Sequence, residues 1–271
     1  MKTHLLAALA VMLWAAASAG AQTALFLSVT GTGNGLELGV LAGPIGAGGA
    51  PVAAAWPGGR AEWVFVRTVG AQENLARVSA EAGARTVTVP RPAGAGPLVA
   101  GVDLAPVLVE LKGDELAALA QAAGFPGPER ERLARVAAER GGVRLRRVES
   151  VKAIVPGSDP VGGSVVTSKA GQVAELRPLA SVLWAPAGSD VPLKVFVDGS
   201  AAAGVRVIAV NETTGARHEL TSDAGGVCLV PMAPGAWRAE FHHVRAPAAD
   251  EPADGVMYTG TLTFRNTGRA S

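Results

Sequence analysis

Short apolar segments separated by glycine and proline are the feature that most constrains how this chain can fold, because this spacing is typical of β-sheet proteins. Six such segments follow one another in the last third of the sequence, at the spacing of a β-sandwich. Asp-Gly, Thr-Gly and Pro-Gly pairs between them suit tight turns. We therefore expect six strands here: Leu193–Val197, Gly204–Asn211, Arg217–Leu220, Val227–Val230, Ala236–Val244 and Val256–Phe264.

Earlier in the chain the same strand character appears. In one segment, Trp63 and Phe65 fall on one side and Glu62 and Thr68 on the other, which predicts a half-buried strand. The strands expected before residue 187 are Ala24–Thr30, Leu36–Leu41, Ala61–Val69, Arg85–Val89, Leu98–Leu111, Val143–Val155 and Gln172–Leu176.

Two glycine-rich segments lie between these expected strands. Gly31–Gly35 resembles a phosphate-binding loop in its glycine spacing, but no Lys-Ser/Thr pair follows it and no helix opens after it. We interpret it as a hairpin turn. Gly43–Gly59 is interrupted throughout by glycine and proline, which indicates a long loop.

Two helices are expected within the first half. Asp114–Ala123 has its apolar residues at helical spacing, and Gly124 marks its end. The second helix begins at Pro128, a favoured first helical position, and stops at Gly141-Gly142. We expect the two to form a helical insertion over residues 113–141.

The amino terminus has the pattern of a secretory signal. Lys2 provides a positive start, Leu5–Ala17 an almost unbroken apolar run, and Ala19–Ala21 a small-residue cleavage site. We therefore expect residues 1–21 to be removed and the protein to be periplasmic or secreted. Cleavage after Ala19 and a retained membrane anchor are the alternatives. No later apolar run is long enough to span a bilayer, so we expect no further membrane segment.

Charge and cysteine content narrow the possible partners. The 24 basic and 23 acidic residues nearly balance, so no polyanionic partner is indicated and we expect no nucleic acid binding. The single cysteine, Cys228, cannot form an internal disulfide, and its apolar neighbours predict a buried side chain rather than a reactive thiol.

These patterns predict a mainly β protein with two β-sandwich-like domains. The first covers residues 22–187 and carries the helical insertion. The second, an Ig-like sandwich, covers residues 188–267, and residues 268–271 form a tail. The boundary is expected near residues 187–190, after the prolines that follow the last strand of the first domain.

The last segment resembles the prealbumin-like modules that are also known as carboxypeptidase regulatory-like domains. The resemblance rests on a strand followed by a glycine-containing turn, then on three further short motifs. In this chain they read Val197-Asp198-Gly199, Ala203-Gly204-Val205-Arg206-Val207, Thr221-Ser222-Asp223-Ala224-Gly225-Gly226 and Pro234-Gly235-Ala236-Trp237.

Over residues 144–264 the order of features is similar to a domain-of-unknown-function family of periplasmic proteins, often labelled the periplasmic component of a cobalt or nickel transport system. The matching features are Lys152, Ala174–Pro178, Ala187-Gly188 and Thr261–Phe264. The resemblance implies a role in nickel or cobalt uptake, with a membrane metal transporter or another envelope component as partner. Members of that family commonly carry a histidine just after signal cleavage, where this chain has Gln22–Leu27.

Candidate metal ligands must therefore come from elsewhere in the chain. Nickel and cobalt favour imidazole, and carboxylates could complete a site. The candidate ligands are His242, His218, Asp250, Glu251 and Asp254.

The adjacent histidines His242 and His243 point to opposite faces if their segment is a strand. His243 then shares a face with Trp237 and Phe241, which predicts a buried, hydrogen-bonded ring. His242 shares the other face with Arg238, so the alternative to a ligand is an exposed polar position.

Two further hypotheses remain open. The segment Glu129–Arg147 carries seven arginines and three glutamates, which indicates a solvated surface or a contact for anionic lipid or glycan.

No Gly-x-Ser-x-Gly or metalloprotease motif is present, so we expect a non-enzymatic binding or accessory protein. The alternative function is a structural or adhesive envelope module that binds glycan or protein through exposed Trp56 or Trp184.

Overall fold

A computed structural model describes residues 23–32, 35–45, 51–57, 60–76, 84–94, 96–157 and 163–268. The expected signal peptide, residues 1–21, and residues 269–271 of the expected tail lie outside this part of the chain. Within it no helix is long and apolar enough to cross a bilayer.

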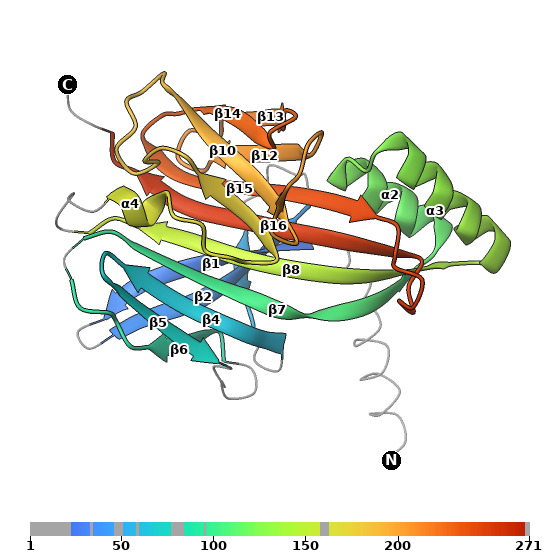
Figure 1. Ribbon diagram of the computed structural model, residues 1–271, viewed down its shortest axis with the longest axis horizontal. Coiled ribbons are helices and arrows are strands. Elements are labelled where there is room, and N and C mark those ends of the chain that lie inside the picture. Colours follow the sequence, from blue (N-terminus) through green and yellow to red (C-terminus); the bar gives the residue numbers. More distant parts are fainter. Residues whose placement is uncertain are drawn as a thin grey trace, which may run out of the picture.

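The expected mainly β class is confirmed (Figure 1). The helices are α2 (Gly113–Ala123), α3 (Gly127–Arg140) and α4 (Gly163–Val166). The strands are β1 (Thr23–Thr32), β2 (Gly35–Pro44), β3 (Val52–Ala54), β4 (Ala61–Thr68), β5 (Ala71–Ala76), β6 (Thr86–Val89), β7 (Leu98–Leu111), β8 (Val143–Val155), β9 (Ala174–Pro178), β10 (Asp190–Val197), β11 (Ser200–Ala201), β12 (Arg206–Asn211), β13 (Arg217–Thr221), β14 (Val227–Pro231), β15 (Gly235–Arg245) and β16 (Gly255–Asn266).

The strands form one large sheet and two small ones. A central eight-stranded sheet has the order β13-β12-β15-β16-β8-β7-β4-β5. One four-stranded sheet contains β1, β2, β3 and β6, and the other contains β9, β10, β11 and β14.

Alternation along β4 shows how the sheets are layered. Phe65 packs into a core with β9, β10 and β14, whereas Val64 and Val66 pack into a core with β1, β2 and β6. The two small sheets therefore cover opposite faces of the central sheet, which we call the β10 face and the β1 face.

One shared sheet joins the two segments that we expected to be separate domains. Strand β16 pairs in parallel with β8, from Gly255 opposite Leu145 to Phe264 opposite Ile154. In addition, β9 from the first segment pairs with β10 from the second. The expected boundary near residues 187–190 therefore does not separate the sheets. A sequence pattern identifies strands, but it does not say which distant strands pair.

The helical insertion is confirmed between β7 and β8, at one end of the molecule (Figure 1). Helix α2 ends at Gly124, whose φ of 69° is left-handed, and α3 ends at Gly141 with a φ of 77°. Pro128 lies in the first turn of α3, as expected. Both helices bury an apolar face against the ends of the neighbouring strands.

Two expectations for the first half need correction. Strand β4 packs on both faces rather than on one, because a small sheet covers each side; Glu62 within it and Val69 beyond its end are exposed. The expected loop Gly43–Gly59 contains strand β3, which pairs with Val40–Ala42 of β2. The expected hairpin at Gly31–Gly35 agrees with the antiparallel pairing of β1 and β2, although residues 33 and 34 lie outside the described residues.

Strand β1 lies at the edge of its sheet, so every second carbonyl needs a partner from elsewhere. The central sheet supplies these partners from side chains. Thr261 Oγ1 donates to the Leu25 carbonyl at 2.7 Å, and Arg147 Nη2 donates to the Thr23 carbonyl at 2.9 Å. These bonds fasten the β1 sheet to β8 and β16.

Cys228 is buried as expected, with 4% of its surface exposed. Burial raises the pKa of its thiol to about 11, so the thiol stays protonated at neutral pH. The side chain packs as a small apolar group on the β10 face.

Candidate functional site

His242 is buried on the β1 face of strand β15. Its Nδ1 atom lies 3.1 Å from Thr259 Oγ1, and its Nε2 atom lies 3.9 Å from Glu240 Oε2. The expected division of faces is confirmed, but the expected exposure is reversed. His242 is 4% exposed, whereas His243 is only half-buried, because β1 and α2 pack over the face that holds His242.

His218 lies on the opposite face of the central sheet from His242. Its ring stacks on Trp237, with the ring centroids 6.0 Å apart, and Trp237 belongs to the core of the β10 face. Because the sheet separates the two imidazoles, they cannot bind one ion.

The carboxylates expected to complete the metal site bind arginines instead. Asp254 Oδ1 accepts from Arg140 Nη1 at 2.8 Å, and its Oδ2 accepts from the Arg144 backbone amide at 2.8 Å. Glu251 Oε1 accepts from Arg146 Nη1 at 3.1 Å. Arg140, Arg144 and Arg146 therefore hold the β15–β16 loop against α3 and β8.

The five expected ligands do not fit a nickel or cobalt site. The two histidines are separated by the sheet, Glu251 and Asp254 are held by arginines, and Asp250 is exposed in the same loop. Within the described part of the chain, no three histidine, cysteine, aspartate or glutamate side chains are grouped so that they could hold a metal ion.

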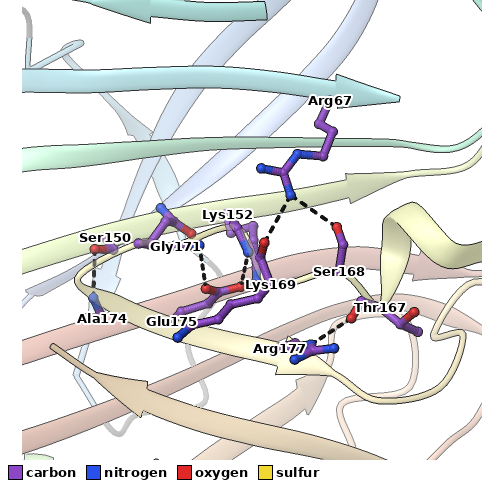
Figure 2. A network of polar contacts seen from close by, with 12 residues as sticks. Arg67, Ser150, Lys152, Thr167, Ser168, Lys169, Gly171, Ala174, Glu175 and Arg177 are labelled. Carbon is purple, nitrogen blue, oxygen red and sulfur yellow. Dashed lines mark hydrogen bonds and ion pairs between the residues drawn. The ribbon is translucent and has the colours of Figure 1, made fainter. Parts of the chain in front are cut away.

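A buried ion pair joins the central sheet to the β10 sheet. Lys152 Nζ of β8 lies 2.9 Å from Glu175 Oε1 of β9, and the side chains are 2% and 0% exposed (Figure 2). Burial lowers the pKa of Lys152, although the charge of Glu175 opposes this change. Burial alone would raise the pKa of Glu175, but Lys152 and two backbone amides hold it below its usual range.

Glu175 also orders the loop that precedes β9. Its carboxylate accepts from the backbone amides of Ala170 at 2.8 Å and Gly171 at 3.0 Å. Arg67 of β4 binds the same loop from the other side, at Ser168 Oγ and the Lys169 carbonyl (Figure 2). Arg67 therefore fixes the loop to the central sheet directly, and Lys152 does so through Glu175.

Asp103 continues this polar cluster along the central sheet. It lies directly across from Trp63 on β4 and from Ser150 on β8. Gln172 Nε2, from the loop before β9, donates to Asp103 Oδ1 at 3.1 Å. Burial raises the pKa of Asp103 to about 6, and hydrogen bonds from Ser150, Gln172 and the Val173 backbone only partly offset this effect.

A pocket of about 540 Å³ opens beside Asp103 on the β10 face. It lies where the β10 sheet ends, because Val173 just before β9 and Asp198 just after β10 both line it. Its titratable and aromatic lining consists of Glu62, Trp63, Asp103, Arg146, Glu149, Asp198 and Tyr258.

Two β-bulges shape the rim of this pocket. The register between β4 and β7 shifts at Glu62, and the register between β7 and β8 shifts between Leu104 and Val107. Glu62 and Pro106, at these two irregularities, both line the pocket. A bulge bends its strand and redirects a side chain, and bulges are frequent beside functional sites.

The pocket carries an excess of negative charge. The Glu149 carboxylate is compensated on the β1 face by Arg60 and Arg147, each 2.7 Å away, and Arg146 is paired with Glu251. Asp198 accepts from the Tyr258 hydroxyl and lies 4.0 Å from Arg245 Nε. Glu62 and Asp103 form no ion pair with any residue in the described ranges.

Sequence reasoning found one half of this cluster indirectly. Lys152 and the segment Ala174–Pro178 are both features of the family resemblance, and the structure brings them together as the Lys152–Glu175 pair. Asp103 was missed because it lies inside a long apolar strand with no motif around it. Trp56, an expected binding residue, is only 6% exposed, and Trp184 is half-buried against the core of the β10 face.

Comparison with known proteins adds little. No family model matches the chain, and no curated protein matches it. A crystal structure of native alpha-2-macroglobulin from Escherichia coli, spanning domains MG0-NIE-MG1, aligns with 86% of this chain and 96% of that chain at 9% identity, with a TM-score of 0.19. A similarity this low supports no conclusion about the site.

Replacing Lys152 by methionine tests the buried pair. Lys152→Met leaves the Glu175 carboxylate buried without its cation, so we expect the free energy of unfolding in urea at pH 7 to fall by about 3–5 kcal/mol. The double variant Lys152→Met/Glu175→Gln should recover much of this loss. Lys194→Met, at a half-buried position on β10, is the matched control and should cost less than about 1 kcal/mol. A similar small loss for Lys152→Met would contradict the assignment.

Asp103 should make the stability depend on pH. Its folded pKa of about 6 exceeds the ordinary value of 3.8, so its contribution is most favourable below pH 3.8 and is lost as the pH rises through 6. We expect Asp103→Asn to be more stable than the parent by up to about 3 kcal/mol at pH 8, and by much less at pH 4. Urea unfolding at both pH values measures this difference. The exposed control Asp190→Asn should show no such pH dependence, and an equal effect of both variants would refute the interpretation.

Proposed function

We propose that the protein is a non-enzymatic binding protein of the cell envelope, and that its binding site is the pocket beside Asp103. The observation that carries the proposal is the convergence of Trp63, the half-buried carboxyl of Asp103 and two β-bulges at one pocket on the central sheet. Burial raises the pKa of Asp103 to about 6, and a carboxyl with a raised pKa in a pocket is a candidate binding group.

The polar groups that line the pocket favour binding over catalysis. Ser150 is 1% exposed, and its Oγ atom accepts from the Ala174 backbone amide at 3.2 Å. Burial and the hydrogen bond to Asp198 raise the pKa of Tyr258, so its hydroxyl stays protonated. These groups hold the walls in place, and we assign them no reaction.

The place of action in this proposal rests on the amino terminus. Residues 1–21 have the charge, apolar length and small residues of a secretory signal, so we place the protein in the periplasm or outside the cell. A partner in the envelope is part of the same proposal. Metal uptake, which the family resemblance implies, gains no support from the placement of the five expected ligands.

Blocking the pocket tests the proposed function. The test is saturation-transfer NMR of the purified chain with a fragment library of cations, anions, neutral amides and monosaccharides. Val173 lines the pocket and is 37% exposed, so Val173→Trp should fill the pocket without disturbing the core. We expect at least one class of fragment to bind the parent protein and to lose at least tenfold in affinity in this variant.

The matched control is Leu179→Trp, which adds the same ring at a position 40% exposed and outside the pocket lining. It should bind the fragments as the parent does. If no fragment of any class binds the parent, or if the two tryptophan variants behave alike, the pocket is not a binding site.

A further inference from the structure

The charges around the pocket indicate what it binds, and this step rests on the proposed function. Glu62 and Asp103 face the pocket without an ion pair in the described part of the chain, while the arginine in the lining, Arg146, is paired with Glu251. Glu62 is exposed, whereas the Asp103 carboxylate is partly withdrawn from water without a cation, which is unfavourable, and a bound cation removes that cost.

A second observation is independent of charge. Gln172 is 1% exposed, and its Nε2 atom bonds Asp103 Oδ1. The other atom of the same amide, Oε1, is a buried acceptor with no donor among the described residues. Gln172 does not line the pocket, and its Nε2 atom also donates to the Val102 and Val151 carbonyls, so this amide positions the Asp103 carboxylate rather than contacting a ligand. An ammonium group brings three N–H donors to that carboxylate.

An aromatic ring stands beside these acceptors. Trp63 lies directly across from Asp103 on the neighbouring strand, so the two side chains leave the same face of the sheet close together. Its indole is half-buried and lines the pocket. The face of an indole attracts organic cations, and tryptophan is the most favourable side chain for this contact.

We infer that the pocket binds an alkylammonium group, held between the ring of Trp63 and the carboxylates of Asp103 and Glu62. The ammonium donates to the carboxylates of Asp103 and Glu62, and the alkyl stem lies against the indole. A metal ion fits less well, because no three metal-binding side chains converge within the described residues.

This inference makes binding depend on pH. At pH 5 only about a tenth of Asp103 is ionised if its pKa is about 6, so the apparent affinity should be about tenfold weaker than at pH 7.5. The charged and titratable groups around Asp103 are Glu62 on β4, Arg146 and Glu149 on β8, Asp198 after β10, Tyr258 on β16, and Glu175 with its partner Lys152.

The experiment compares two probes of equal length. N-acetyl-lysine methylamide carries the ammonium, and N-acetyl-norleucine methylamide carries the same stem without it. Both are titrated into the purified chain at pH 7.5 and pH 5, with the indole N–H resonances as the readout and Trp63→Phe to assign the signal. Butylamine serves as a third probe, to separate a free amine from a peptide lysine as the source of the ammonium group.

We expect the lysine probe to bind at pH 7.5 at least tenfold more tightly than the norleucine probe, and about tenfold more weakly at pH 5. Asp103→Asn should abolish this pH dependence and weaken binding at least tenfold, while Asp190→Asn should change neither. Glu62→Gln, at an exposed position, provides a second pocket variant that is expected to fold and to lose about threefold in affinity.

Binding of butylamine alone, or of the lysine probe alone, supports the inference and identifies the source of the group. Equal binding of the norleucine probe, or tighter binding of N-acetyl-glutamate methylamide, overturns it. If neutral or anionic fragments bind and are blocked by Val173→Trp while every amine fails, the pocket remains a binding site and only its assignment to an ammonium is wrong.

Discussion

Strand β8 is buried on both of its faces, and the rest of the structure depends on how its charged side chains are paired. Because charged groups are costly to withdraw from water, each one on β8 needs a partner from a neighbouring layer. On the β1 face, Arg147 binds Glu149 and the Thr23 carbonyl. On the β10 face, Lys152 binds Glu175. The polar side chains of one strand thus hold three layers together.

The pocket is a consequence of the same layering. The β10 sheet covers only part of the central sheet, and where it stops the central strands lose their cover. Asp103 lies at this limit, so its side chain is half-buried under the loop before β9 and also lines the pocket. The bulges at Glu62 and beside Pro106 bend β4 and β7 at the opening of the pocket. The irregular parts of an otherwise regular sheet therefore coincide with its candidate site.

Local sequence patterns predicted the elements well and their partners poorly. Helix caps and strand alternation are local signals. They therefore predicted the helix ends at Gly124 and Gly141 and the bounds of β8. The parallel pairing of β16 with β8 joins residues far apart in the sequence, and no local signal encodes it. His242 was wrongly expected on an exposed face because β1, which covers that face, comes from the other end of the chain. No local sequence pattern indicated Asp103 as a site residue, because its raised pKa depends on cover by a loop from elsewhere in the sequence.

The central claim is that the half-buried carboxyl of Asp103 binds a cationic group in the pocket, and carbon-detected NMR titration of Asp103 tests it most directly. We expect its side-chain carboxyl resonance to titrate near pH 6 in the free protein, as burial requires. Saturation with N-acetyl-lysine methylamide should move that midpoint well below 6, because a bound ammonium favours the ionised form. A midpoint near 4 in the free protein, or one that the saturating amine leaves unchanged, would contradict the account.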